Sequence, residues 1–335
     1  MSLSESIKEK ARHLGFDLVG ITTADSPTHS AQFRQWLADG FRGEMAYMAR
    51  NAGKRIAPEQ VLAGARSIIV VGMNYHSGTG VSPVSAQAMN GRDARSTGRI
   101  ASYAAGARDY HEVLGEKLRQ LAEFVAGIWY VDTGPILERD LAQRAGIGFI
   151  GKHTNLINRQ LGNWIFLGAV LTTLELPADE PEREYCGTCR RCIDICPTRA
   201  IVAPYRLDAR LCISYLTIEL KTSIPVELRP LIGDRVFGCD DCLEVCPWNR
   251  FARLSQFRPR ELPALTEFLS WDEAKFKAFF AGTPMYRVKR RGFLRNVCIA
   301  LGNRGDKSAR PALQKALDDP EPLVREHAAW AVQQL

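Results

Sequence analysis

Three stretches of the chain consist mainly of apolar and β-branched residues and have the length of a β-strand. They are LVGITT from Leu18, SIIVVGM from Ser67 and NWIFLGAVL from Asn163. Between the last two, the segment DYHEVLGEKLRQLAEFVAG repeats its apolar residues at helical spacing. The residues that share one face of this predicted helix are Leu114, Leu118, Leu121 and Val125. The pattern predicts an α+β fold class for this part, in which helices pack on a sheet.

A hydrophilic connector, PADEPEREY, interrupts the apolar pattern and predicts a domain boundary. We expect one domain over residues 1–178, a second over 179–250 and a helical region over 251–335. The last region ends in DDPEPLVREHAAWAVQQL, which resembles one unit of a HEAT repeat. An ordinary helical hairpin would give the same pattern.

The apolar stretches also bear on the cellular location. The segment IFLGAVLTTLEL from Ile165 is too short to cross a bilayer as a helix. The first residues, MSLSESIKEKARHLG, have the pattern of an amphipathic helix and not of a signal peptide. We therefore expect a cytoplasmic protein without a membrane partner, whose nine cysteines are reduced thiols and not disulfides.

Eight of these cysteines form two closely spaced groups. The run CGTCRRCIDICP has the C-x2-C-x2-C-x3-C-P spacing of bacterial ferredoxins, and CDDCLEVCP follows it with an isolated cysteine between them. In two-cluster ferredoxins the last cysteine of each run ligates the other cluster. The predicted ligands of the first [4Fe–4S] cluster are Cys186, Cys189, Cys192 and Cys246. Those of the second are Cys196, Cys212, Cys239 and Cys242.

Structural zinc is the alternative, because paired C-x2-C knuckles also bind zinc. Two runs that each close on Cys-Pro favour iron–sulfur clusters, which carry electrons. Cys298 lies outside both runs, and we expect it to be a small buried apolar residue.

Positive charge is concentrated near the carboxyl end. The chain has a net charge of +7, and residues 250–310 contain fourteen Lys and Arg against five Asp and Glu. The segment RVKRRGFLRN places basic side chains beside Tyr286 and Phe293, which suits phosphates and stacked bases. A solvated face or a docking site for an acidic electron donor such as flavodoxin would look the same. The predicted tRNA-binding residues are Lys289, Arg290, Arg291 and Arg295.

Two further motifs do not support the functions that they suggest. GIGFIG, from Gly146 to Gly151, follows a helical stretch, whereas a dinucleotide-binding fingerprint follows a strand. We expect Gly146 to end that helix in a left-handed cap. DYHEVLG is a near miss to the Asp-x-His-x-x-Gly cobalamin motif, and we expect His111 in the first turn of a helix, half exposed.

Several motifs together resemble the epoxyqueuosine reductases, cobalamin-dependent iron–sulfur enzymes of tRNA modification that are related to reductive dehalogenases. They are ASYAAGARDYH, VDTGPILERDLAQRAGIGFIGKH, CGTCRRCIDICPTRAI, CISYLTIE and FGCDDCLEVCPWN, and they span essentially the whole chain. One departure is visible: the family often reads Gly-Lys-Asn where residues 151–153 read Gly-Lys-His, which leaves the role of His153 open.

The resemblance implies a nitroreductase-like α/β sandwich that holds cobalamin, a ferredoxin-like domain with two [4Fe–4S] clusters and a HEAT-like region that grips tRNA. The implied reaction is the two-electron reduction of epoxyqueuosine to queuosine at the wobble position of tRNAs with GUN anticodons, the last step of queuosine biosynthesis. Cobalamin in its cob(I) state would be the reductant. The implied partners are the tRNA and an electron donor such as flavodoxin or ferredoxin, and we expect a monomer.

The resemblance also implies the site residues. Asp132 in VDTGP would be the proton donor, and burial under the corrin would raise its pKa. The residues implied to line the cobalamin site are Arg55, Ser102, Asp132, Leu156, Leu167 and Ser214.

Other classes of protein remain open on the residues alone. A ferredoxin-type electron carrier would need no cobalamin, and a zinc-stabilised RNA-binding protein would need no iron. A cytosolic reductive dehalogenase would act on small molecules, against which the basic tail and the missing Tat signal argue.

Overall fold

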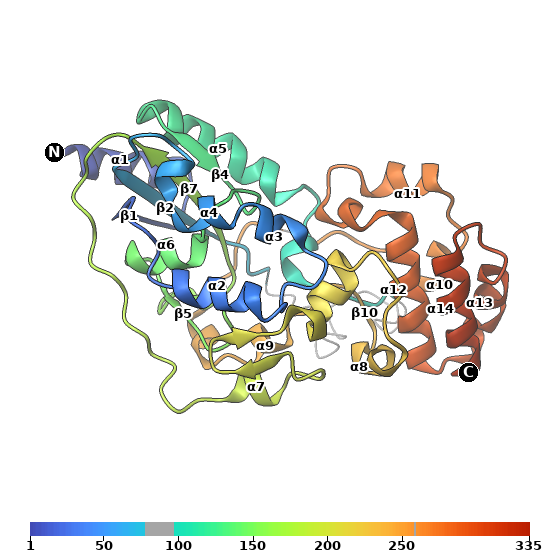
Figure 1. Ribbon diagram of the computed structural model, residues 1–335. Helices are drawn as coiled ribbons and strands as arrows, with labels where there is room; N and C mark the ends of the chain where they lie inside the picture. The colour runs from blue at the N-terminus through green and yellow to red at the C-terminus, as the bar shows by residue number, and fades with distance from the viewer. Residues whose placement is uncertain (78–96, 258) are drawn as a thin grey trace.

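A four-stranded antiparallel sheet forms the centre of the amino-terminal part of the computed structural model, which describes residues 1–77, 97–257 and 259–335 (Figure 1). The strand order is β1–β2–β7–β4. The three strands predicted from apolar runs are confirmed, and β4 is the short apolar run before Asp132. The bounds are β1 Leu18–Thr23, β2 Ser67–Asn74, β7 Ile165–Thr172 and β4 Ile128–Tyr130.

Helices cover both faces of this sheet, which confirms the α+β class. The predicted amphipathic helix is α5 (Tyr110–Phe124), and it packs with α1 (Leu3–His13) on the face that carries Ile69 and Val71. The opposite face carries Ile68 and Val70 and packs against α6 (Glu138–Arg144). Successive residues of β2 thus face different cores, and all eight are buried.

Shorter elements complete this domain. Gly146 has φ +71° just after α6, so the predicted left-handed cap is confirmed. His111 lies in the first turn of α5, as predicted, with its side chain 27% exposed. The remaining elements are α2 Ser30–Ala38, α3 Ala46–Arg50, α4 Ala52–Ile56, β5 Phe149–Ile150 and β6 Leu156–Ile157.

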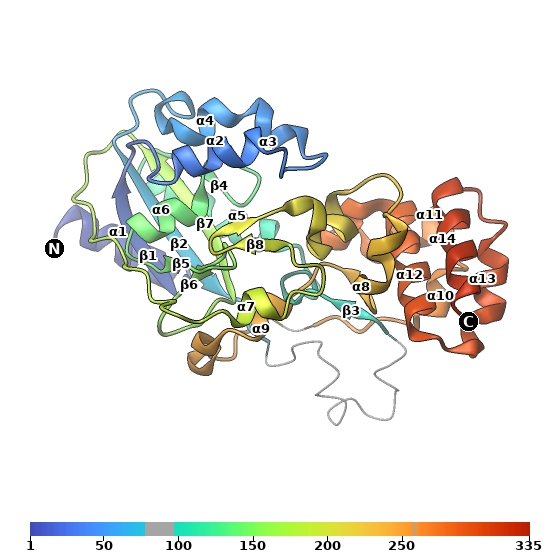
Figure 2. The same ribbon diagram turned by 60° about the horizontal axis from the view of Figure 1, so that its bottom comes forward.

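The cysteine-rich region is built from short turns of helix. The helices α7 (Arg191–Asp194) and α9 (Asp241–Glu244) lie side by side beneath the sheet domain (Figure 2). A π-helical turn, η6 (Tyr215–Glu219), connects this region to the tail. The other elements here are β3 Arg99–Ile100, β8 Ile201–Ala203, β9 Arg206–Leu207, α8 Arg229–Ile232, β10 Arg235–Phe237 and η8 Pro247–Phe251.

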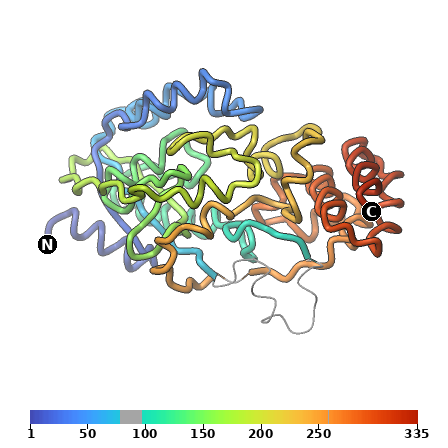
Figure 3. The backbone as a smooth tube through the Cα atoms, turned by 90° about the horizontal axis from the view of Figure 1, so that it is seen from below, coloured from blue at the N-terminus to red at the C-terminus, as the bar shows by residue number. Residues whose placement is uncertain are grey.

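The tail is helical, and its last three helices pack together at the end of the molecule away from the sheet (Figures 1 and 3). Its core is continuous with that of residues 213–237, so a single apolar core crosses the predicted boundary at residue 250. Cys298 is fully buried in this core, as predicted. The tail elements are α10 Leu265–Phe268, α11 Glu273–Phe280, η9 Pro284–Val288, α12 Lys289–Arg304, α13 Arg310–Ala316 and α14 Pro322–Gln333.

Two of the four predicted tRNA-binding residues are in the interior, and for them the expectation of a surface patch is wrong. Arg290 is 7% exposed, forms an ion pair with Asp319 and donates to the carbonyl oxygen of Trp271 at 2.7 Å. Arg295 is fully buried and donates to the carbonyl oxygens of Leu216, Leu220 and Thr222. Only Lys289 and Arg291 of the predicted set are exposed.

Among the described residues, no helix is both long enough and apolar enough to cross a membrane.

Candidate functional site

Two of the buried thiols lie near the other cysteines of the set to which the spacing assigns them. Burial, together with the neighbouring charges of Cys186, Cys192 and Cys189, raises the pKa of Cys246 to about 11. Burial likewise raises the pKa of Cys242, together with the charges of Cys212, Cys239 and Cys196. Each thiol thus lies near the members of its own set, although Cys246 and Cys242 are only four residues apart.

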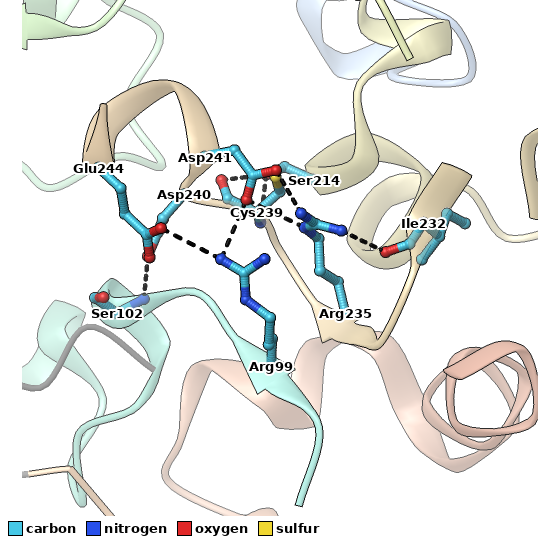
Figure 4. A network of polar contacts seen from close by, with 9 residues as sticks. All are labelled: Arg99, Ser102, Ser214, Ile232, Arg235, Cys239, Asp240, Asp241 and Glu244. Carbon is cyan, nitrogen blue, oxygen red and sulfur yellow. Dashed lines mark hydrogen bonds and ion pairs between the residues drawn. The ribbon is translucent and has the colours of Figure 1, made fainter. Parts of the chain in front are cut away.

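A polar network fixes the loop of the second set (Figure 4). The hydroxyl of Ser214 accepts a hydrogen bond from the backbone N–H of Cys239 at 3.1 Å. The backbone N–H of Ser102 donates to the carboxylate of Asp240 at 2.6 Å. Two residues predicted to line the cobalamin site, Ser102 and Ser214, therefore lie directly against this cysteine loop.

Two arginines also hold this loop (Figure 4). Arg99 from β3 forms ion pairs with Asp241 at 3.2 Å and with Glu244 at 3.3 Å. Arg235 from β10 also pairs with Asp241 and donates to the carbonyl oxygen of Ile232 at 2.8 Å. Two neighbouring strands, β3 and β10, therefore brace the loop through their arginines.

Asp132 follows β4 in a left-handed conformation, with φ +55°. This conformation is unusual for a residue other than glycine, and such backbone strain is typical of functional positions. The hydroxyl of Tyr110 donates to Oδ2 of Asp132 at 2.7 Å, and Nε2 of His111 lies 3.5 Å from the same oxygen. Nδ1 of His111 is 2.7 Å from Asp109, the residue that caps α5.

The protonation of this group differs from the expectation that the pKa of Asp132 is raised. Desolvation does act in that direction, but hydrogen bonds from His111 and Tyr110 outweigh it and lower the pKa of Asp132 to about 2. For His111, desolvation favours the neutral ring, but the bonds to Asp109 and Asp132 raise its pKa to about 9. At neutral pH the proton therefore resides on His111, and Asp132 is a carboxylate.

The loop after Asp132 is held by Arg55, which is 6% exposed. Its guanidinium donates to the carbonyl oxygens of Gly134 and Ile136 at 3.1 and 2.9 Å. Nearby, burial raises the pKa of Glu138 to about 8, so that side chain is largely protonated at neutral pH. Arg55 thus fixes the segment that positions Asp132.

A small hollow lined partly by aromatic side chains lies beside Tyr110. Its lining includes Ser102, Tyr103, Tyr110 and Phe166. Leu156 is 4% exposed in the core beneath α6, and Leu167 on β7 packs against the same core. Both leucines therefore contribute to the packing of this core.

Several buried polar atoms around this region have no hydrogen-bond partner among the described residues. They are Nε of Arg55, Oε1 of Glu138 and Nε2 of His153. An unpaired buried polar group costs about 1–3 kcal/mol, so a further polar group is expected to meet them. Cobalamin, whose corrin is rimmed by amide side chains, fits this set of atoms.

His153 is 3% exposed, and burial lowers its pKa to about 4, so its ring is neutral. Nδ1 accepts from the backbone N–H of Asn155 at 3.1 Å, which leaves the proton on Nε2. The residue that departs from the family pattern thus presents a donor without a partner in the described chain.

Four residues near Asp132 were not among the predicted site residues. They are Tyr110 and His111 from α5, and Glu219 and Arg287, which form an ion pair at 2.8 Å. Arg287 helps to lower the pKa of Asp132, although 155 positions separate them in the chain. Tyr110 and His111 stand in the motif DYHEVLG, and their contact with Asp132 depends on the packing of α5 against β4, which no local pattern contains.

Comparison with known proteins gives the same result over the whole chain. The family model described as "Epoxyqueuosine reductase QueG, DUF1730" matches residues 55–133, a 4Fe-4S double cluster binding domain matches 185–249, and HEAT repeats match 292–335. The epoxyqueuosine reductase of Xanthomonas campestris is 43% identical, with 98% of this chain and 95% of that protein covered. That of Escherichia coli is 42% identical, with 99% and 89% covered.

Solved structures of epoxyqueuosine reductases superpose on nearly the whole chain. A crystal structure of epoxyqueuosine reductase with an epoxyqueuosine-modified tRNA-Tyr stem loop superposes with a TM-score of 0.88 at 32% identity, covering 99% of this chain and 90% of that one. The Bacillus subtilis enzyme, solved with its catalytic aspartate loop swung out of the active site, has a TM-score of 0.86 at 31% identity with the same coverage. The chain belongs to the epoxyqueuosine reductases: it is an oxidoreductase that converts epoxyqueuosine to queuosine and carries a domain for two [4Fe–4S] clusters.

Proposed function

We propose that this chain removes the epoxide oxygen of epoxyqueuosine at the wobble position of tRNAs with GUN anticodons, as the last step of queuosine synthesis. The epoxide gains two electrons and two protons and leaves an alkene and water. The observation that carries this proposal is that one hollow is lined both by a side chain that contacts Asp132 and by a residue that contacts the second cysteine loop. Tyr110, which donates to Asp132, and Ser102, which bonds the second cysteine loop, line that same hollow.

Crossed ligation of the two clusters is part of the proposal. Cys246 would complete the cluster of Cys186, Cys189 and Cys192, and Cys196 would join Cys212, Cys239 and Cys242. The support is the grouping of the thiols described above, together with the side-by-side packing of α7 and α9. This arrangement puts the second cluster beside the hollow.

The residues that would hold cobalamin are Arg55, Ser102, Ser214 and Asp132, with His153 as an additional donor. When bound, cobalamin supplies the strong reductant that the epoxide carbon requires. Leu156 and Leu167 would act indirectly, by shaping the core beneath the cofactor.

Proton supply at the epoxide oxygen would come from the pair of Asp132 and His111. A general acid must carry its proton near neutral pH, and in this pair His111 carries it. His111 would first transfer its proton to the carboxylate of Asp132, and Asp132 would then donate that proton to the developing oxyanion. The 2.7 Å hydrogen bond from Tyr110 keeps the carboxylate oriented. Asp109 holds the far nitrogen of the imidazole ring.

The tRNA would lie between the hollow and the tail. The relative crystallised with an epoxyqueuosine-modified stem loop makes tRNA the expected substrate here. Exposed Arg287, Lys289 and Arg291 would meet phosphates, whereas Arg290 and Arg295 are internal. A tRNA substrate also supports a cytoplasmic location, and we keep the expectation that the chain acts as a monomer.

A single-turnover assay tests this function. Anaerobically reduced protein, with iron and cobalamin quantified, is mixed with epoxyqueuosine-containing tRNA, and the released nucleosides are separated by mass. We expect queuosine from the protein loaded with both cofactors and none from protein reconstituted without cobalamin. Equal conversion without cobalamin would overturn the proposed role of the hollow.

A further inference from the structure

The thiols of the first set lie under a band of aromatic side chains at the surface. Cys186 and Cys246 belong to a small core with Phe149, and Trp248 packs against it. The ring centroids of Tyr185 and Trp248 are 6.1 Å apart, and those of Trp248 and Phe251 are 6.0 Å apart. Tyr185 is 38% and Phe251 is 42% exposed, so this band reaches solvent directly over the cysteines.

Arginines border the band at both ends. The guanidinium of Arg159 lies 4.9 Å from the ring centre of Tyr185, and that of Arg250 lies 4.6 Å from the ring centre of Phe251. Further exposed arginines neighbour the rings or the first-set cysteines in the chain. The acids there are Glu182, which pairs with Arg159 at 3.5 Å, Asp194, which pairs with Arg190 at 3.7 Å, and Glu184. We define the docking face as the three rings with the exposed arginines that stack on them or neighbour this segment in the chain, Arg159, Arg183, Arg190, Arg191, Arg250 and Arg253.

The second set of thiols occupies a different environment. Cys212 and Cys239 pack against the core of the tail, and Cys242 packs against the core of the sheet domain. These thiols lie between the two largest cores of the molecule and beside the hollow. Of the two cysteine sets, the first therefore lies nearer the solvent and the second lies nearer the proposed reaction site.

We propose that the docking face receives an acidic electron-transfer flavoprotein and that electrons enter at the first cluster. This inference rests on the proposed function and adds the surface and the kind of partner. Because arginines outnumber acidic residues here, the docking face attracts a negatively charged protein. Aromatic residues and arginine are also enriched in protein–protein interfaces. Aromatic contact over the cluster shortens the distance between donor and acceptor.

The electrons balance in single steps. A flavin hydroquinone gives one electron to the first cluster, which changes from the 2+ to the 1+ state, and the flavin becomes a semiquinone with loss of a proton. Transfer to the second cluster restores the first. Two such donations supply the two electrons that the epoxide consumes.

Nucleic acid would also be attracted by arginines, but the position of the face argues against it. The helices α7 and α9 lie beneath the sheet domain, whereas α12 and its exposed Arg291 lie at the tail (Figures 1 and 2). Donor and tRNA can therefore bind at the same time. Loss of tRNA binding on mutation of the docking face is the outcome that would assign it to RNA instead.

The test compares two reductants in anaerobic stopped flow. The iron–sulfur clusters absorb at roughly 400 nm. The loss of this absorbance is followed after mixing with flavodoxin hydroquinone or with dithionite. The variant is Arg159→Glu/Arg250→Glu, and the matched control is Arg12→Glu/Arg119→Glu, exposed arginines on α1 and α5. We expect the flavodoxin rate at low salt to fall about tenfold or more in the variant and to lose most of its salt dependence. The dithionite rate, the iron content and the tRNA affinity should match those of the control.

Unchanged reduction by flavodoxin, or a drop equal to that of the control pair, would overturn the proposal. If Arg159→Glu/Arg250→Glu loses iron, Arg183→Glu/Arg253→Glu is measured instead, because neither residue stacks on a ring of the band. Failure of this docking leaves dithionite-driven conversion of tRNA intact. Failure of the proposed function would remove that conversion with every reductant.

Discussion

At the scale of single residues, the chemistry depends on where one proton resides. Asp132 alone looks like a carboxyl at the end of a strand, and from the sequence its acid role requires a raised pKa. The fold instead places Tyr110 and His111, neighbours on α5, against the same carboxylate oxygen. Hydrogen bonds to the charged form outweigh desolvation, so the acid is a pair and not one residue.

Replacing Asp132 by Asn tests whether the carboxylate is needed for proton transfer. The amide keeps the shape and can still accept from Tyr110, but it cannot relay a proton. We expect iron, cobalamin and tRNA binding to persist while single-turnover conversion falls by about 10²–10⁴. Loss of bound cobalamin in Asp132→Asn would make the residue a support of the cofactor. Near wild-type conversion would assign the acid to another group, with His153 as a candidate.

The pH profile tests His111. Because the acid must be protonated, conversion by the wild-type protein should fall as pH rises through about 9, the pKa of His111. His111→Gln removes this titration, so its conversion should be low, by about 10²-fold, and flat through that range. Tyr110→Phe, which leaves His111 in place, is the control and should keep the alkaline fall. An unchanged profile in His111→Gln would exclude the residue as proton source.

At the scale of elements, α12 shows what a basic run in sequence can and cannot predict. Lys289, Arg290 and Arg291 are consecutive, and a helix necessarily points them in different directions. Burial of Arg290 depends on Asp319, which α13 and the following turn bring to it, and no local pattern contains that partner. The strands, α5 and the cysteine sets were predictable because their signals are local periodicity and spacing. The pairing of Arg287 with Glu219 and the charge on Asp132 arise from contacts across the fold.

Stability and tRNA affinity should therefore separate along α12. Arg290→Ala leaves Asp319 buried without its ion pair and should lower the free energy of unfolding by about 3–5 kcal/mol. The midpoint of urea unfolding, followed by tryptophan fluorescence, measures this loss. Arg291→Ala, a neighbouring exposed arginine, should change the same free energy by less than about 0.5 kcal/mol.

The complementary experiment concerns tRNA. Lys289→Glu/Arg291→Glu should flatten the dependence of log affinity on log salt by about 0.7–0.9 for each phosphate that these side chains neutralise, and spare the visible spectrum. An unchanged slope would make the exposed side of α12 an ordinary solvated face.

At the scale of the whole molecule, the cysteines tie three parts of the chain together. Cys246 is the last cysteine of the second run but lies with the first set, and Cys212 and Cys239 pack against the core of the tail. The sheet domain supplies the other wall of the hollow through Tyr110 and Phe166. The sequence motifs predicted each part, whereas their convergence on one hollow required the packing of distant segments.

Crossed ligation predicts how iron is lost when single thiols are removed. The intact protein should hold roughly eight irons, the sum of two four-iron clusters. Cys246→Ala should damage the cluster of Cys186, Cys189 and Cys192, and thereby stop reduction by flavodoxin at the docking face while the second cluster can still form. Cys298→Ala is the control, because Cys298 is fully buried in the tail core and belongs to neither set, and its iron content should stay whole. Iron analysis and the electron paramagnetic resonance of the dithionite-reduced proteins distinguish the outcomes. Loss of the cluster of Cys239 and Cys242 in Cys246→Ala would mean that ligation follows the order of the runs and is not crossed.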